Sequence, residues 1–544
     1  MEELGVFDIL GPIMVGPSSN HTGGACRIGK VARAISGGDP RSLVMGFYSV
    51  TLAKSYRGHA TDRAIVAGLL GMDEDDLGIR DALKMALARN LSVSMEPIPP
   101  PVPDNNIMRC DVTDAHGNRC VITGFSVGGG SIKIADVDGY PLDLDGNGYV
   151  ILIECDRMSW PQVRDKVGAA LGSGLSVAVS ERTGVIPGTH PAPTGRGVQA
   201  IMATVRCPAE PPETALDSIS HTPGMVRLRY VPPVRRFFRR TGVEMEPITF
   251  AWMMADEPGM PLHERIIARE MSRDGKTYDE VVGEMSHVLG VMREAKEAGI
   301  KGDLRLLGGL DDGQGGRRMV EFQARTKPLA GATLVRSVGY ALAVAEVNAS
   351  MGRIVACPTG GAAGLLPGVL LGALEAGDLP DDAGVNALFV AAATGAAIGR
   401  LCSFSGSVGG CLGEIGFACA MGASLVAYLE TQDSTAASHA AALALKSVMG
   451  LVCDPPAGPV EIPCIKRNGV LVGAAFAAGE MAAAGVRSAI PPDEVVLATK
   501  NVQDLMPQTI KGDMDSSLGC TPTAREMKSR WAKILAQEDS STRS

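Results

Sequence analysis

The sequence predicts a multidomain α+β protein with three folded parts. At 544 residues the chain is too long for a single hydrophobic core. Its secondary-structure signals also change along the sequence: mixed strand and helix patterns come first, then a regular βαββαβ order, then almost purely helical periodicity. We therefore expect an N-terminal α/β domain, a ferredoxin-like domain and a C-terminal all-α domain.

The α/β domain is expected to span residues 1–147. Its patterns predict an apolar entry segment, one strand, three helices and a hairpin that turns at Asp114-Ala115-His116-Gly117, with a proline-rich loop before the hairpin. In chain order these elements are 6–15, 26–35, 44–50, 61–70, 78–90, the loop 97–103, and the hairpin strands 109–113 and 120–123.

The ferredoxin-like domain is expected to span residues 148–231. Four strands and two helices alternate in the order βαββαβ, which defines this motif. The strands are predicted at 149–155, 175–180, 198–206 and 225–230, and the helices at 160–171 and 215–220. The glycine- and proline-rich stretch 184–197 is its long central loop.

The remaining chain divides into a linker, a helical domain and a tail. Residues 232–245 form the linker, and its basic run at 234–240 is either solvated or a subunit contact. Residues 246–535 are expected to be all helical, with polar amphipathic helices near 263–298 and helices rich in Ala, Gly and Leu from 333 onward. We expect residues 536–544 to be disordered.

Composition excludes several classes of protein. A net charge of −9 argues against a nucleic-acid partner, which requires a basic face. The N-terminus lacks a signal-peptide pattern, and the longest apolar stretch, 383–399, indicates a buried helix rather than a membrane span. The 12 cysteines lack the spacing of a disulfide scaffold. These features predict a cytoplasmic protein with no membrane partner.

Three cysteines near the C-terminus stand in turn-like sequence. They occur in GGCLGE (409–414), LVCDPPAG (451–458) and EIPCIKRN (461–468) as Cys411, Cys453 and Cys464. A thiol in a turn can present its sulfur to a metal, whereas a single buried cysteine is more often core. Three thiolates without a local fourth predict a soft-metal site with one open position. The absence of CxxC pairs and ligating histidines favours iron–sulfur over zinc.

Two polar segments near the N-terminus contain histidine. The first, GPSSNHTGG (16–24), places several polar side chains just before a predicted helix, more than a helix cap needs: Ser18, Ser19, Asn20, His21 and Thr22. The second, YRGHATD (56–62), contains His59. Imidazole suits proton transfer at neutral pH, and the chain has only 8 histidines. Both segments are therefore candidate parts of an active site.

A third polar region lies in the helical part. Asn348 in EVNAS is followed by the glycine-rich turn CPTGGAAG (357–364), which includes Thr359, Gly360 and Gly361. Such a turn before a helix can hold an anion. It lacks the lysine of a phosphate loop, so nucleotide binding is not expected.

These segments resemble, over about residues 1–535, the iron–sulfur-dependent L-serine dehydratases. GPSSNHTGGACRIGKVAR is similar to the signature that opens the family's β domain, and RGHATD and GFSVGGG are similar to further β-domain segments. NASMGRIVACPTGGAAG, GGCLGEIG and CDPPAGPVEIPCIKRN resemble the three hallmark segments of the α domain. The unit 149–230 is similar to the ACT domain that some members carry.

The resemblance implies a function and a set of roles. Cys411, Cys453 and Cys464 would hold a [4Fe–4S] cluster whose fourth iron binds substrate, and oxygen should inactivate the enzyme. His59 or His21 would be the base that removes the Cα proton of L-serine, on the way to pyruvate and ammonia. The carboxylate and ammonium groups would be held by Ser18, Ser19, Asn20, Thr22, Asn348, Thr359, Gly360 and Gly361. The resemblance also implies amino-acid degradation that feeds gluconeogenesis, a homodimer, and an ACT-like unit that either regulates activity or builds that dimer.

Other functions stay open at this point. The substrate could be L-threonine or another small β-hydroxy amino acid, because one methyl group changes binding by only about 1–3 kcal/mol. A pyridoxal-phosphate dehydratase is disfavoured, since no phosphate loop stands opposite a plausible Schiff-base lysine. A non-catalytic amino-acid sensor with a zinc-stabilised helical domain is the alternative from another class.

Overall fold

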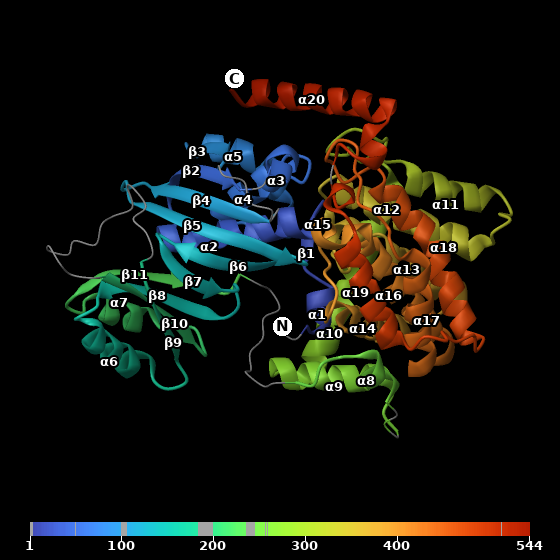
Figure 1. The fold of residues 1–544 in the computed structure, drawn as a ribbon, viewed down its shortest axis with the longest axis horizontal. Helices are drawn as coiled ribbons and strands as arrows, with labels where there is room; N and C mark the ends of the chain where they lie inside the picture. The colour runs from blue at the N-terminus through green and yellow to red at the C-terminus, as the bar shows by residue number, and fades with distance from the viewer. Residues whose placement is uncertain are drawn as a thin grey trace.

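A sheet-rich N-terminal half lies beside a helical C-terminal half in the computed structural model (Figure 1). The structure describes residues 4–48, 50–98, 106–182, 200–234, 245–255, 257, 259–512 and 514–543. The expected mixed N-terminal and helical C-terminal regions are confirmed at this level. The predicted loops 97–103 and 184–197 and the linker 232–245 fall largely outside the described residues.

A six-stranded sheet forms the first part, in the order β3-β2-β4-β5-β6-β7. Only β2 and β3 are parallel, and the expected hairpin is the antiparallel pair β4–β5. Helices α2 and α4 pack on each other, and α2 lies against β4, β5 and β6. The elements are α2 (Ala25–Ser36), β2 (Pro40–Phe47), α3 (Val50–Ser55), α4 (Thr61–Leu69), η2 (Leu77–Asp81), α5 (Ala82–Ala88), β3 (Ser92–Pro97), β4 (Ile107–Asp114), β5 (Arg119–Gly128), β6 (Ser131–Val137) and β7 (Tyr140–Leu144).

A four-stranded antiparallel sheet follows, in the order β11-β8-β10-β9. Its chain order is the expected βαββαβ: β8 (Tyr149–Asp156), α6 (Trp160–Leu171), β9 (Ser176–Glu181), β10 (Ala200–Cys207), α7 (Glu213–Ser220) and β11 (Met225–Val231). Ile151 and Ile153 pack with the helices on one face, whereas Val150 and Leu152 join the core of the first part. The alternation of strand residues thus buries both faces. A buried ion pair of 2.7 Å between Asp138 and Arg229 also joins the two parts.

The C-terminal half is a helical body centred on α16, which packs against α13, α14, α17 and α18. Small residues let its helices approach closely: a Cβ at Gly422 would lie 3.3 Å from Ala475 of α18. The helices are α8 (Phe250–Met254), α9 (Leu262–Asp274), α10 (Tyr278–Lys301), α11 (Gly315–Arg325), α12 (Ala332–Ala349), α13 (Leu365–Gly377), α14 (Asp381–Gly399), α15 (Gly406–Gly409), α16 (Ile415–Thr431), α17 (Ser434–Val448), α18 (Cys464–Ala483), α19 (Pro492–Leu505) and α20 (Pro522–Arg543).

Two stretches of this body, Gly360–Gly377 and Asp381–Gly399, are long and apolar enough to cross a membrane. A bent pair, Gly406–Leu412 with Ile415–Thr431, passes the same test together. The two single stretches are 72% and 78% buried inside the structure. Their apolar side chains belong to the main hydrophobic core, which accounts for their composition.

One expectation from the sequence was wrong. The C-terminal part is not purely helical, because β12 (Arg353–Val355) pairs antiparallel with β1 (Ile13–Val15) from the other end of the chain. The short helix α1 (Val6–Ile9) also packs on α14. Helix α20 continues to Arg543 through the stretch where the sequence predicted a tail, and Trp531 packs this helix against Leu310 and Ala457.

Candidate active site

A pocket of about 90 Å³ contains most of the chemically active residues identified in the sequence. It lies where the N-terminal segments meet the helical body. Its lining includes seven predicted site residues: Ser18, Asn20, His21, His59, Gly361, Cys453 and Cys464. Segments more than 400 residues apart in sequence therefore share one cavity.

The polar segment after β1 forms a π-helical turn, η1 (Ser19–Gly24), that runs directly into α2. The sequence predicted a loop here, and π turns frequently occur at functional sites. Ser18 caps the turn by accepting a hydrogen bond from the His21 amide at 3.2 Å. Thr22 accepts one from the Ser18 amide and donates one of 2.7 Å to the carbonyl of His59. Thr22 thus joins the two histidine segments, while the neighbouring Ser19 is buried and does not line the pocket.

The two histidines lie side by side, with ring centroids 4.8 Å apart. Nδ1 of His59 lies 3.0 Å from the carbonyl oxygen of Ser55, so Nδ1 carries the proton and Nε2 keeps its lone pair. Desolvation lowers the pKa of His59 below its usual 6.5, which favours the neutral ring. Nε2 of His21 pairs with Oδ1 of Asn106 at 3.0 Å. The site therefore holds a neutral imidazole that can accept a proton.

A close backbone contact holds the turn that contains His59 against the cysteine loop, the segment 454–463 that connects Cys453 to Cys464. A Cβ at Gly58 would lie 2.7 Å from the carbonyl carbon of Gly458, so only glycine fits. After His59 the chain turns into α4 through Ala60, whose φ of 52° is left-handed. His59 and the segment between Cys453 and Cys464 are thus fixed to each other.

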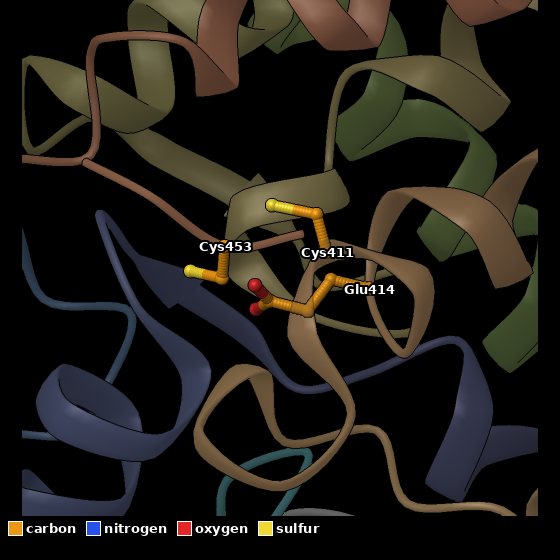
Figure 2. Close-up of side chains that lie close together, drawn as sticks. All are labelled: Cys411, Glu414 and Cys453. Carbon is orange, nitrogen blue, oxygen red and sulfur yellow. The ribbon is translucent and has the colours of Figure 1, made fainter. Parts of the chain in front are cut away.

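The three cysteines come from three elements: Cys453 and Cys464 line the pocket, whereas Cys411 lies beside Cys453 and is not part of the lining. Cys411 lies in the turn η4 (Gly410–Leu412), Cys453 makes a β-bridge with Lys511, and Cys464 is the first residue of α18. The sulfurs of Cys411 and Cys453 and a carboxylate oxygen of Glu414 lie within 4.8 Å of one another (Figure 2). Cys464 lines the same pocket but is outside this closest group.

The three thiols suit a soft metal centre. A hydrogen bond with Cys411 and desolvation hold the pKa of Cys453 well above its ordinary value. Desolvation and the nearby Cys411 do the same for Cys464. Crowded thiols of this kind lose their protons when a metal binds them. Arg467 donates a hydrogen bond of 3.4 Å to the sulfur of Cys411, which adds a positive charge beside the thiols.

Glu414 is a site residue whose role the sequence did not reveal. Its carboxylate lies beside the thiols and lines the pocket. Desolvation raises its pKa to about 7, although the Thr359 hydroxyl donates it a hydrogen bond of 3.1 Å that acts in the opposite direction. Thr359 therefore orients Glu414 and is absent from the pocket lining itself.

Asn348 and Gly360 support the site and are not part of its lining. Asn348 donates a hydrogen bond of 2.9 Å to the carbonyl of Pro17. A Cβ at Gly360 would lie 3.0 Å from both the Pro17 oxygen and the Ser19 nitrogen. Both residues fix the start of the polar segment, and the substrate contact expected of them stays a prediction.

Further polar groups line the pocket that the sequence did not single out. Ser405 and Ser407 share a hydrogen bond of 2.8 Å, and the Asn20 amide nitrogen lies 3.5 Å from Ser405. The buried Oδ1 of Asn20 has no hydrogen-bond partner in the described structure. Lys511 adds an ammonium group, which donates to the carbonyl of Gln503 at 2.6 Å. An unsatisfied buried acceptor beside hydroxyls and a cation is typical of a site for a polar ligand.

Comparison with protein families matches both halves of the chain. A model described as serine dehydratase beta chain matches residues 5–94, and one described as serine dehydratase alpha chain matches residues 257–517. The β12 strand, the turn at 359–361 and all three cysteines fall in the second match.

Individual relatives agree with this division. The probable L-serine dehydratase alpha chain of Bacillus subtilis is 37% identical over 268 residues, 49% of this chain and 88% of that protein. The probable L-serine dehydratase beta chain of the same organism is 41% identical over 154 residues, which are 28% of this chain and 69% of that protein. L-serine dehydratase 2 of Escherichia coli is 29% identical over 496 residues and spans 88% of this chain and 90% of its own length. The protein therefore belongs to the L-serine dehydratase family of enzymes, with the β-type part and the α-type part joined in one chain.

Proposed function

We propose that this enzyme converts L-serine to pyruvate and ammonia by α,β-elimination of water. The observation that carries the proposal is the pocket itself, which is lined by the neutral imidazole of His59 and by Cys453 and Cys464. A base and a soft-metal site in one cavity supply the two functions that this elimination requires: removal of the Cα proton and departure of the β-hydroxyl.

Cys411, Cys453 and Cys464 are proposed to hold a [4Fe–4S] cluster. The convergence of the three thiols and the cation of Arg467 beside Cys411 support this assignment. When bound, the cluster supplies a Lewis-acidic iron for the substrate hydroxyl. Three thiol ligands leave one iron without a protein sulfur, which is the feature that such chemistry needs.

His59 is proposed as the base, through Nε2. Its Nδ1–H is engaged by Ser55, so Nε2 is the nitrogen able to accept the Cα proton. His21, whose tilted ring lies 4.8 Å away and is paired with Asn106, orients the substrate. Loss of the proton and the hydroxyl gives water and aminoacrylate, which becomes the imine and hydrolyses to pyruvate and ammonia.

Polar groups around the two histidines are proposed to bind the rest of the substrate. Ser18, Asn20 and the Gly361 backbone face the cavity and suit the carboxylate, together with the Lys511 ammonium. Ser405 and Ser407 supply further hydroxyls on the opposite side of Asn20. Ser19, Thr22, Asn348, Thr359 and Gly360 hold this arrangement from behind.

The βαββαβ unit is proposed to be an ACT-type domain that regulates the enzyme or forms a homodimer, and the enzyme is proposed to act in the cytoplasm. The sheet order β11-β8-β10-β9 supports the first assignment. The 12 cysteines are all free thiols, which suits a reducing compartment, in which a cluster stays intact.

The proposal is tested by pyruvate release from protein purified without oxygen. L-serine should be turned over, and His59→Gln should lower kcat by at least about 100-fold, the usual effect of removing a general base. His116→Gln is the matched control, because His116 is exposed on the β4–β5 turn. Comparing L-threonine with L-serine defines the substrate. An unchanged kcat in His59→Gln would show that another group removes the proton.

A further inference from the structure

The C-terminal helix α20 reaches both halves of the active site from outside the pocket. Figure 1 shows it as a long helix along one side of the molecule, extending from the helical half toward α5. Its residues lie beyond position 517, where the match to the alpha-chain family model ends. It contacts the cysteine loop at one point and helix α4, which follows His59, at another.

The first contact is apolar and involves Trp531. This side chain is 7% exposed and forms a small cluster with Leu310 and Ala457. Ala457 belongs to the segment 454–463, which connects Cys453 to Cys464. Ile534 adds a contact to the same surface, because its Cδ1 lies 3.5 Å from the position of a Cβ at Gly309. Helix α20 therefore packs directly on the loop that connects Cys453 to Cys464.

The same loop is anchored from a second side by Glu461. This carboxylate is 1% exposed and accepts hydrogen bonds from the amides of Gly308, Leu310 and Asp311. The segment 308–311 is thereby tied to the cysteine loop. Arg530 of α20 donates a hydrogen bond of 3.2 Å to the Leu310 carbonyl. Helix α20, segment 308–311 and the cysteine loop are thus each in contact with the other two.

The second contact is an ion pair with helix α4. Arg63, in the first turns of α4, donates to both carboxylate oxygens of Glu538 at 2.9 and 3.0 Å. One nitrogen of Arg63, Nη2, makes both hydrogen bonds, and the side chains of Arg63 and Glu538 are 18% and 43% exposed, so this is a partly exposed ion pair. His59 stands just before α4. A cleft of about 890 Å³, lined by Arg57, Asp62 and residues of α20, opens between the two contacts.

We propose that α20 is a clamp that fixes the distance between His59 and the cysteine pair, with Trp531 and Glu538 as its positioning residues. The backbone contact of Gly58 with Gly458 lies between its two attachment points. Releasing either attachment lets the cysteine loop and the start of α4 move apart. The effect on turnover depends on the function proposed above, but the effect on the two segments does not.

Hydrogen–deuterium exchange on the full-length protein, purified without oxygen, tests the clamp. Trp531→Ala should raise exchange in 454–463 about tenfold or more, because it removes the side chain that holds the loop closed. Trp531→Phe should stay near the wild type, and Lys533→Ala, on the exposed side of α20, should have no effect. Glu538→Gln should raise exchange in the first turn of α4. Strand β8 serves as the internal reference.

A chemical readout complements the exchange. In the cluster-free full-length chain, Trp531→Ala should raise the alkylation rate of Cys453 and Cys464 relative to Cys207 of β10. Fast exchange in α20 with no change in 454–463 or in the two thiols would overturn the proposal, whatever the serine activity. Should Trp531→Ala lose its whole fold, seen as fast exchange in β8, Glu538→Gln and Trp531→Leu are judged by the same criteria.

Discussion

At the scale of single residues, the site depends on which nitrogen of His59 carries the proton. The Ser55 carbonyl accepts from Nδ1 at 3.0 Å, and desolvation keeps the ring neutral. A neutral imidazole with its Nε2 lone pair in a cavity is suited to accept a proton. The pair of His21 with Asn106 gives the second ring a different environment, so the two histidines need not share one role.

The lowered pKa of His59 predicts the pH dependence of turnover. The base works while it is neutral, so kcat/KM should be retained above its pKa and lost as the pH falls through that value, which lies below 6.5. The lowered pKa of His59 also makes the stability of the fold depend on pH. The unfolded chain binds this proton at higher pH than the folded one, so the contribution of His59 to stability falls as the pH falls below 6.5.

The measurement is kcat/KM for L-serine from pH about 5 to 8, with the exposed His116→Gln variant as the control. An acid limb centred above pH 6.5 in both proteins would contradict the assignment of His59 as a desolvated neutral base.

Local sequence motifs located the histidines and cysteines but not their neighbours. Glu414, Ser405 and Lys511 reach the pocket only because distant segments converge there. The run SFSGS at 403–407 was a signal that could have identified Ser405 and Ser407. Asn106 carries no local signal, since its role depends on the position of a side chain 85 residues away.

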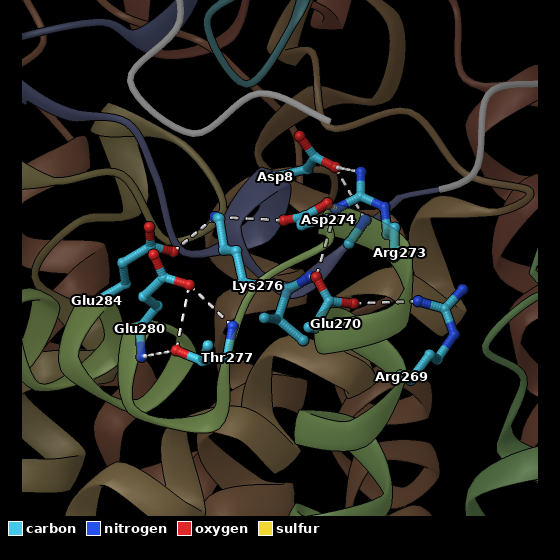
Figure 3. Close-up of polar contacts among 11 residues, drawn as sticks. Asp8, Arg269, Glu270, Arg273, Asp274, Lys276, Thr277, Glu280 and Glu284 are labelled. Carbon is cyan, nitrogen blue, oxygen red and sulfur yellow. Dashed lines mark hydrogen bonds and ion pairs between the residues drawn. The ribbon is translucent and has the colours of Figure 1, made fainter. Parts of the chain in front are cut away.

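At the scale of elements, the N-terminal segment belongs to the helical body rather than to the sheet that follows it. Strand β1 pairs with β12, and α1 lies beside α14 and near α9. Figure 3 shows the charged network that fixes α1: Arg273 bonds Asp8 at 2.7 Å, and Glu270 pairs with Arg269 and Arg273. Sequence periodicity could not reveal this, because strand pairing across more than 300 residues leaves no local pattern.

Breaking this network should destabilise the protein. Glu270 is fully buried between two arginines and also accepts from the Val6 amide, so Glu270→Gln should cost about 3 kcal/mol of stability. Glu321→Gln is the matched control: the side chains of Glu321 and its partner Arg317 are both nearly half exposed, so this pair should contribute about 1 kcal/mol or less.

Chemical denaturation followed by helical circular dichroism compares the two variants. Equal stabilities would contradict a structural role for the buried network. A selective loss in Glu270→Gln should also release α1 and thereby loosen the segment that carries Ser18 and His21.

At the scale of the whole molecule, the active site is built between the two parts that the family comparison matches separately. His21 and His59 come from the first part, and the cysteines come from the second. The β1–β12 pairing, the Asn348–Pro17 hydrogen bond and the Gly58–Gly458 contact all cross this boundary. The sequence predicted these parts and, through the family resemblance, one site shared by their histidines and cysteines, but not the contacts that join them.

This interface predicts that covalent continuity between the parts is dispensable. Residues 1–234 and 245–544, expressed together as separate chains, should co-purify and retain serine turnover within about tenfold of the intact chain, because the joining contacts lie elsewhere. The Bacillus subtilis relatives named as separate alpha and beta chains favour this outcome. Halves that elute separately at micromolar concentration would contradict it.

The central claim is that Cys411, Cys453 and Cys464 together hold one iron–sulfur cluster beside His59. It is tested most directly by iron and sulfide counts on protein purified without oxygen, for the wild type and for each Cys→Ser variant, with Cys402→Ser as control because that buried thiol bonds Val496 away from the pocket. The wild type and Cys402→Ser should contain about four iron and four sulfide per chain and lose them in air, and each ligand variant should contain far less. A wild type without iron, or ligand variants with an intact iron content, would contradict the account.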